Sequence, residues 1–120
     1  MLMLVATHTV EHARSLEIES DVLDLGRAGR HGRLVVSGLV GGENDLDFAF
    51  AVEQLIHAGL TDLVVDVVGA EFRDAASLRL LARLRDRIEQ DGGRVVIDGL
   101  GSAATRILEA TSTLDAIRTR

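Results

Sequence analysis

Two histidines and a glutamate near the N-terminus have the order and spacing of a zinc-binding motif. His8, Glu11 and His12 form the pattern H-x-x-E-H, in which both histidines bind the metal and the glutamate acts as a base. That chemistry requires the motif in the middle of a helix, a third protein ligand and a cleft. This segment is rich in threonine and valine and belongs to a short chain, so adventitious metal binding is favoured and no catalytic metal is expected.

A glycine-rich segment is a second candidate, for anion binding. Residues 26–32 read Gly-Arg-Ala-Gly-Arg-His-Gly and contain three cationic or titratable side chains. A dinucleotide-binding loop must open directly into a helix, whereas residues 33–40 are β-branched and apolar. The glycines permit positive φ angles, so the segment is predicted to be a hairpin turn.

The composition excludes several classes of chemistry. The chain has no cysteine, which removes thiol catalysis and thiolate metal sites. It also lacks lysine, all 13 basic residues being arginine, which removes Schiff bases and the phosphate-binding P-loop lysine. A net charge of −6 and an aromatic content of 2% disfavour nucleic-acid binding. No signal peptide or membrane span is recognised, so a cytoplasmic protein without a membrane partner is expected.

Hydrophobic periodicity and turn residues predict a single α/β domain. Strands are expected at 16–25, 33–40, 63–67 and 94–97, and helices from about 45 to 58, 75 to 90 and 102 to 110. Strands separated by helices require crossovers, hence a four- to five-stranded mixed, mostly parallel sheet with helices mainly on one face. Residues 1–15 have weak periodicity and are assigned as an N-terminal extension to a domain at 16–120. The tail, 112–120, fits a last strand or helix.

The first predicted helix has apolar residues on two faces. Five of them recur at helical spacing and should face the core: Phe48, Ala49, Val52, Leu55 and Ile56. Leu46, Phe50 and His57 fall on the opposite side, which is unusual for a monomer. They are interpreted as the apolar part of a partner interface, with coverage by residues 1–14 as the alternative.

The second predicted helix carries a row of arginines. Arg79, Arg83 and Arg87 recur every four residues on one face. Such a row could dock an acidic partner, but a solvated helix face is the commoner case and is favoured here.

The loop before this helix resembles the hallmark of the STAS family, the anti-sigma-factor antagonist domains. That hallmark is a strand ending in Asp, an aromatic residue, and then Asp-Ser-Ser/Thr-Gly-Leu opening a helix. Here residues 63–78 read LVVDVVGAEFRDAASL, with Asp66, Phe72 and Asp74 in matching places. Residues 42–46, Gly-Glu-Asn-Asp-Leu, resemble the family's earlier Gly-Glu-Leu-Asp turn, and residues 92–99 also agree.

Four residues depart from the family pattern. In partner-switching members, a kinase-type anti-sigma factor phosphorylates the Ser or Thr that precedes the helix glycine. The matching position is Ala76, and the preceding serine is replaced by Ala75. Ser77 stands at the glycine position and is a disfavoured alternative acceptor, while Arg73 stands where the family has an apolar residue. The resemblance therefore implies a chain held in the partner-binding state, or one controlled by another input.

The resemblance implies a non-enzymatic bacterial transcription regulator without a cofactor. Its partner would be an anti-sigma factor of the GHKL kinase type, whose capture frees a sigma factor. Asp74 is expected to contact that partner, although a plain helix N-cap would also explain it. A scaffold or accessory STAS subunit of a lipid-transporting ABC complex or a sensory assembly is the alternative, and a homodimer is left open. The expected binding surface consists of Asp45, Leu46, Phe50, Asp74, Ala75, Ala76, Ser77 and Arg79.

Overall fold

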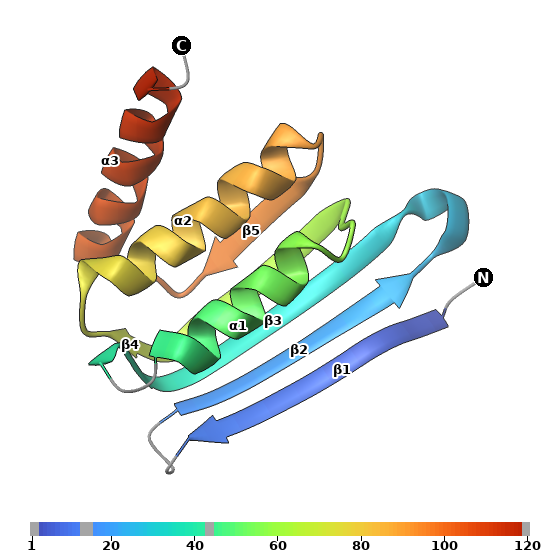
Figure 1. Cartoon of the computed structure of the whole chain (residues 1–120), viewed down its shortest axis with the longest axis horizontal. Coiled ribbons are helices and arrows are strands. Elements are labelled where there is room, and N and C mark those ends of the chain that lie inside the picture. Colours follow the sequence, from blue (N-terminus) through green and yellow to red (C-terminus); the bar gives the residue numbers. More distant parts are fainter. Residues whose placement is uncertain (1–2, 13–15, 43–44, 119–120) are drawn as a thin grey trace.

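The structure is a computed structural model of the 120-residue chain and describes residues 3–12, 16–42 and 45–118. Its strands build one sheet in the spatial order β1-β2-β3-β4-β5, which is also the order along the chain (Figure 1). The strands are β1 (Met3–His12), β2 (Leu16–Asp24), β3 (Arg30–Val40), β4 (Asp62–Phe72) and β5 (Arg94–Asp98). The helices are α1 (Asp45–Ile56), α2 (Ala75–Gln90) and α3 (Ser102–Arg118), and a single 3₁₀ turn (Gly26–Ala28) joins β2 to β3.

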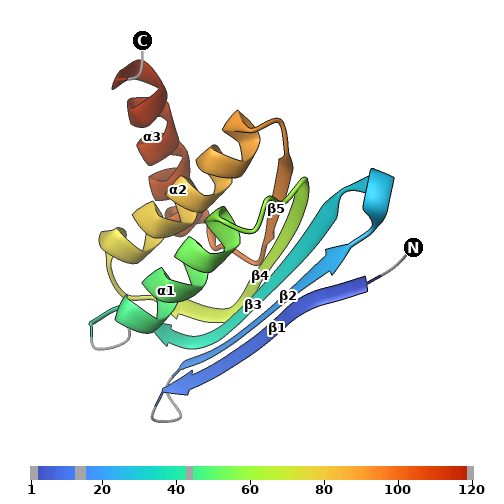
Figure 2. The ribbon, with the colours of Figure 1, turned by 45° about the vertical axis from the view of Figure 1, so that its right-hand side comes forward.

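The sheet is mixed, as predicted. β1 pairs antiparallel with β2 and β2 antiparallel with β3, whereas β3 with β4 and β4 with β5 are parallel. Four of the five strands therefore run in one direction, and only β2 opposes them. The two parallel pairs need crossovers, which α1 and α2 supply, and both helices lie on the same face of the sheet (Figure 2). The α/β class with helices on one face is confirmed.

Residues 3–12 are part of the sheet, which differs from the expected separate extension. They form β1 and pair along β2 from Met3 opposite Asp24 to His12 opposite Leu16. Pairing satisfies backbone groups of β2 that would otherwise face solvent at an edge. The same geometry bears on the H-x-x-E-H motif, because residues 8–12 have strand backbone and lack the helical spacing that a zinc peptidase requires. α3 is also longer than predicted and extends to Arg118.

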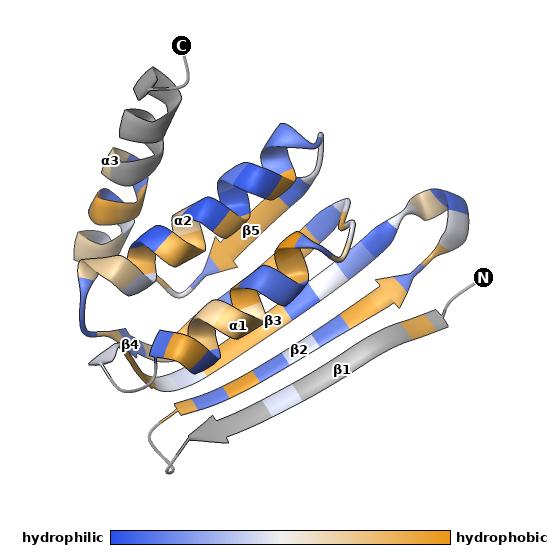
Figure 3. Ribbon diagram, viewed as in Figure 1, coloured by the Kyte–Doolittle hydropathy of each residue, from blue (hydrophilic) through white to orange (hydrophobic). Residues whose placement is uncertain are grey.

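The core lies between the sheet and the helices. β2 alternates between buried and more exposed residues, and hydropathy alternates with them (Figure 3). The largest fully buried side chain is that of Phe48, whose ring meets Phe72 of β4 edge-to-face with centroids 6.0 Å apart. Apolar side chains of the other elements complete the core, among them Leu16, Ile18, Leu34, Val36, Val40, Val52, Leu63, Val65, Val67, Leu81 and Leu84.

Candidate functional site

The candidate site lies where β3 and β4 end and α1 and α2 begin. Since β3 and β4 are parallel neighbours, their carboxyl ends meet at one edge of the sheet. The Arg73 amide donates to the Val40 carbonyl at 2.8 Å and joins the two loops. Gly41 has φ +132°, and a Cβ at this position would lie 2.9 Å from Asp74 Oδ2. Glycine is thus required at residue 41 for the close approach of the two helix starts.

Two carboxylates and one hydroxyl connect these helix starts. Asp74 caps α2, and its Oδ1 accepts hydrogen bonds from the Ser77 amide at 2.9 Å and from Ser77 Oγ at 2.8 Å. Ser77 Oγ also lies 3.3 Å from Oδ1 of Asp45, the first residue of α1. The N-cap role of Asp74 is therefore seen directly, and Ser77 contacts both helices.

Asp74 should make the stability of the domain depend on pH. Hydrogen bonds from the Ser77 amide, the Ser77 hydroxyl and the Gly42 backbone hold the pKa of Asp74 below its ordinary value of 3.8. The ionised group then stabilises the fold above pH 3.8, and this contribution is lost as the pH falls through the folded-state pKa. We expect Asp74→Asn to remove this part of the pH dependence, measured as the free energy of unfolding between pH 2 and pH 6 relative to the wild type.

Two large apolar side chains of α1 are exposed beside the helix starts. Leu46 is 83% exposed and Phe50 56% exposed, as the helical spacing predicted. His57 is exposed directly after the end of α1 and pairs with Glu53 at 3.4 Å. Coverage of these side chains by the N-terminal residues is not seen for residues 3–12, because these form β1 at the far edge of the sheet.

The residues at the start of α2 divide into exposed and buried ones. Ala75, Ala76 and Arg79 are exposed, and neither alanine carries a hydroxyl group. Ser77 is 0% exposed, which corrects its assignment as a contact residue. The side chain lies beneath the surface and can act only through Asp74 and Asp45.

The arginine row of α2 is exposed and partly paired within the chain. Arg83 forms an ion pair with Glu53 of α1, and Arg87 pairs with Asp91 at 3.6 Å. These contacts agree with the favoured interpretation of a solvated face. Arg79, closest to the helix start, remains at the rim of the candidate surface.

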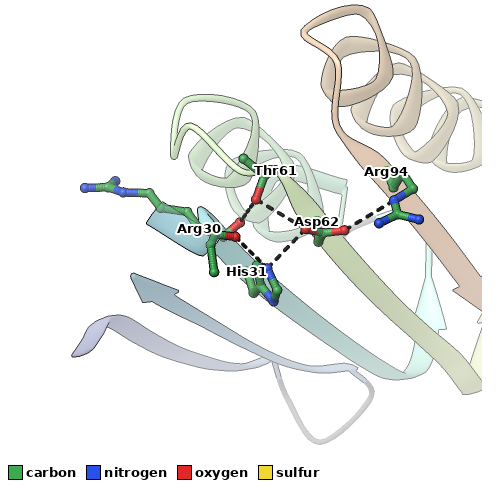
Figure 4. Close-up of polar contacts among 6 residues, drawn as sticks. Arg30, His31, Thr61, Asp62 and Arg94 are labelled. Atoms are coloured by element: carbon green, nitrogen blue, oxygen red, sulfur yellow. Dashed lines mark hydrogen bonds and ion pairs between the residues drawn. The ribbon is translucent and has the colours of Figure 1, made fainter. Parts of the chain in front are cut away.

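A second polar cluster, which the sequence analysis missed, lies at the opposite end of β4 (Figure 4). Asp62 is placed between His31 of β3, at 3.1 Å, and Arg94 of β5, at 3.7 Å. Thr61, the residue before β4, donates its hydroxyl to the Arg30 carbonyl of β3 at 3.0 Å. The strand register brings these residues together, and local spacing contains no signal of it. The His31 ring contacts Asp62, and the Arg30 guanidinium pairs with Asp24 at 3.5 Å and donates to the Ala58 carbonyl at 3.0 Å. The anion-site interpretation of residues 26–32 therefore gains no support.

The described residues show no metal centre and no membrane span. Among them, no group of three histidine, cysteine or acidic side chains could hold a metal ion. Nor is any helix in the described part of the chain long and apolar enough to cross a bilayer. Glu43 and Asn44, which belong to the resembling turn before α1, lie outside the described residues.

Comparison with known proteins supplies the family. Residues 23–117 match the family model described as "Mlab, STAS domain". The chain belongs to the STAS-domain family. The match runs from the end of β2 through α3 and includes both loops of the candidate site.

Two solved structures share the fold of this chain. An anti-sigma-factor antagonist STAS domain from Rhodobacter sphaeroides superposes with a TM-score of 0.56 at 24% identity, covering 73% of this chain and 90% of that one. An anti-sigma factor antagonist from Mycobacterium paratuberculosis gives 0.55 at 19% identity, covering 97% and 82%. No curated protein matched the chain.

Proposed function

We propose that this STAS domain is a non-enzymatic cytoplasmic regulator that binds an anti-sigma factor of the GHKL kinase type. The observation that carries the proposal is the exposed apolar pair Leu46 and Phe50 beside the two helix starts. Two structural neighbours are anti-sigma factor antagonists, which favours a partner of that class. We call the proposed contact area the docking surface: Asp45, Leu46, Phe50, Asp74, Ala75, Ala76 and Arg79, supported from beneath by Ser77.

The chemistry of the docking surface suits a protein partner. Exposed apolar groups at the centre of an interface supply the desolvated contacts that dominate affinity. Asp45 and Asp74 add acidic groups at two helix N-termini, and Arg79 adds a cation at the rim. A partner that buries both Leu46 and Phe50 while presenting basic groups to the aspartates would satisfy the whole surface.

The same surface lacks the usual means of release. Ala75 and Ala76 have no nucleophilic oxygen, so neither can accept a phosphoryl group. The Ser77 hydroxyl is buried and bonded to two carboxylates, out of reach of a kinase. The proposed regulator is therefore always in the unphosphorylated, binding state, and its activity would follow its abundance or another input.

The test is direct binding to a purified GHKL-type anti-sigma factor from the same organism. We expect Leu46→Asp to weaken the complex by about 100-fold, because a charge would be buried at the centre of the interface. Isothermal titration calorimetry measures the loss. Val68→Asp is the matched control, since Val68 is 73% exposed on β4, away from the docking surface. If the wild type and Leu46→Asp bind with equal affinity, the anti-sigma factor does not bind at the docking surface.

A second function is favoured by the missing acceptor itself. A STAS domain without a phosphorylatable residue could serve as a scaffold or accessory subunit, since a permanent subunit needs no release step. Affinity capture from native lysate separates the two functions. Recovery of a transporter ATPase or a sensory assembly, without an anti-sigma factor, would favour the scaffold and remove the sigma-factor mechanism.

A further inference from the structure

Ser77 is a buried polar residue whose position serves two helices at once. It occupies the third residue of α2 and is 0% exposed. A buried hydroxyl is tolerated when it is hydrogen-bonded, and here it has acceptors on both α1 and α2. The STAS resemblance implies glycine at this position, which would leave both contacts unmade. The residue thus adds a connection that the family pattern does not contain.

The geometry is that of one donor shared between two acceptors. Ser77 Oγ is 2.8 Å from Asp74 Oδ1 and 3.3 Å from Asp45 Oδ1. An ionised carboxylate can accept but cannot donate, so the single hydroxyl hydrogen of Ser77 is shared between the two carboxylates. Two carboxylates that face the same atom would otherwise repel each other. The hydroxyl and the positive ends of two helices offset that repulsion and let the acidic groups approach.

The residues joined in this way belong to the two halves of the docking surface. Asp45 immediately precedes Leu46 in the first turn of α1, and Asp74 immediately precedes Ala75 at the start of α2. Backbone hydrogen bonds from the Arg73 amide to the Val40 carbonyl and from Gly42 to Asp74 also join the loops that precede the two helices. Between side chains of the helices themselves, the exposed pair of Arg83 with Glu53 lies further from this surface. Ser77 therefore adds a buried side-chain contact between the first turn of α1 and the first turn of α2.

We propose that Ser77 is a positioning residue that clasps the start of α1 to the start of α2, so that both halves of the docking surface are held in one binding geometry. This rests on the proposed function for its binding consequence, whereas the clasp itself concerns the free protein. Preorganisation of this kind raises affinity because less conformational freedom is lost on binding. A surface without a phosphate switch would in this way be kept ready for its partner.

The first measurement is made on the free protein and needs no partner. In Ser77→Ala we expect amide hydrogen exchange to accelerate by about tenfold in the first turn of α1, since a hydrogen bond to a charged group is lost. The pKa of Asp74 should rise in a carbon-detected NMR titration, because one of its donors is removed. Ser77→Gly should behave in the same way. Ser20→Ala, a hydroxyl deletion at a buried site in β2, should change neither quantity.

The second measurement is the affinity of Ser77→Ala for the anti-sigma factor. We expect a loss of about tenfold, although no atom of Ser77 reaches the partner. Unchanged exchange in α1 and an unchanged Asp74 titration would overturn the clasp. If the exchange in α1 and the Asp74 titration both change while the affinity stays the same, Ser77 has no role in docking. If the wild type binds no anti-sigma factor, the proposed function fails, while the free-protein measurements still decide the clasp.

Discussion

Phe48→Ala is expected to lower the free energy of unfolding by about 3–5 kcal/mol, the largest loss predicted for a single side chain of this domain. Phe48 is 0% exposed and packs edge-to-face on Phe72, so truncation removes buried area, an aromatic contact and dense packing together. The melting temperature should fall by about 10–20 °C. Urea unfolding followed by circular dichroism measures the free energy, and thermal scans measure the shift.

The same helix provides a matched control two residues away. Phe50→Ala removes an identical side chain from a position that is 56% exposed. It should cost less than about 1 kcal/mol of stability, as is usual for surface substitutions. Its effect should instead appear in partner binding, which Phe48→Ala would leave intact in the folded fraction. Equal destabilisation by the two variants would mean that Phe50 belongs to the core.

These two phenylalanines show why much of the fold is predictable from the sequence. A 3.6-residue period places Phe48 with Val52 and Leu55 on the buried face, and all three are buried. Local signals also define α2, because Asp74 caps its start and Asp91-Gly92 end it, and the helix spans the predicted Ala75–Gln90. The β-branched run at residues 33–40 predicts a strand, and these residues belong to β3 at the middle of the sheet.

Features that depend on pairing at a distance were not predictable in this way. β1 is a strand because the edge of β2 is available to it, and its own periodicity is weak. The contact of Asp62 with His31 and Arg94 exists because three strands share a register. Ser77 was placed at the right loop by the family pattern, but its burial and its bond to Asp45, 32 residues earlier, follow only from the packing of α1 on α2.

The proposed loss of the phosphorylation switch can be tested by restoring a hydroxyl group with Ala76→Ser. Ala76 is exposed in the first turn of α2, so a serine there restores an accessible hydroxyl at the position that matches the family's acceptor. We expect the anti-sigma factor and ATP to phosphorylate the variant stoichiometrically, as measured by intact-mass spectrometry. The wild type should remain unmodified. Ala75→Ser, which places a hydroxyl one residue earlier, should also remain unmodified and serves as the control.

Phosphorylation of the variant should then weaken partner binding by about 100-fold or more. The phosphate would be stabilised within the protein by free amides at the helix N-terminus, so the fold should persist. Once the partner covers this surface, however, a hydrated group with a charge of about −2 would be buried beside Asp74, Asp45 and the apolar side chain of Leu46. Its desolvation and its repulsion by those two carboxylates would oppose binding. A phosphorylated variant that binds as tightly as the wild type would show that α2 does not contact the partner. If the anti-sigma factor does not phosphorylate Ala76→Ser, this chain is not a partner of such kinases.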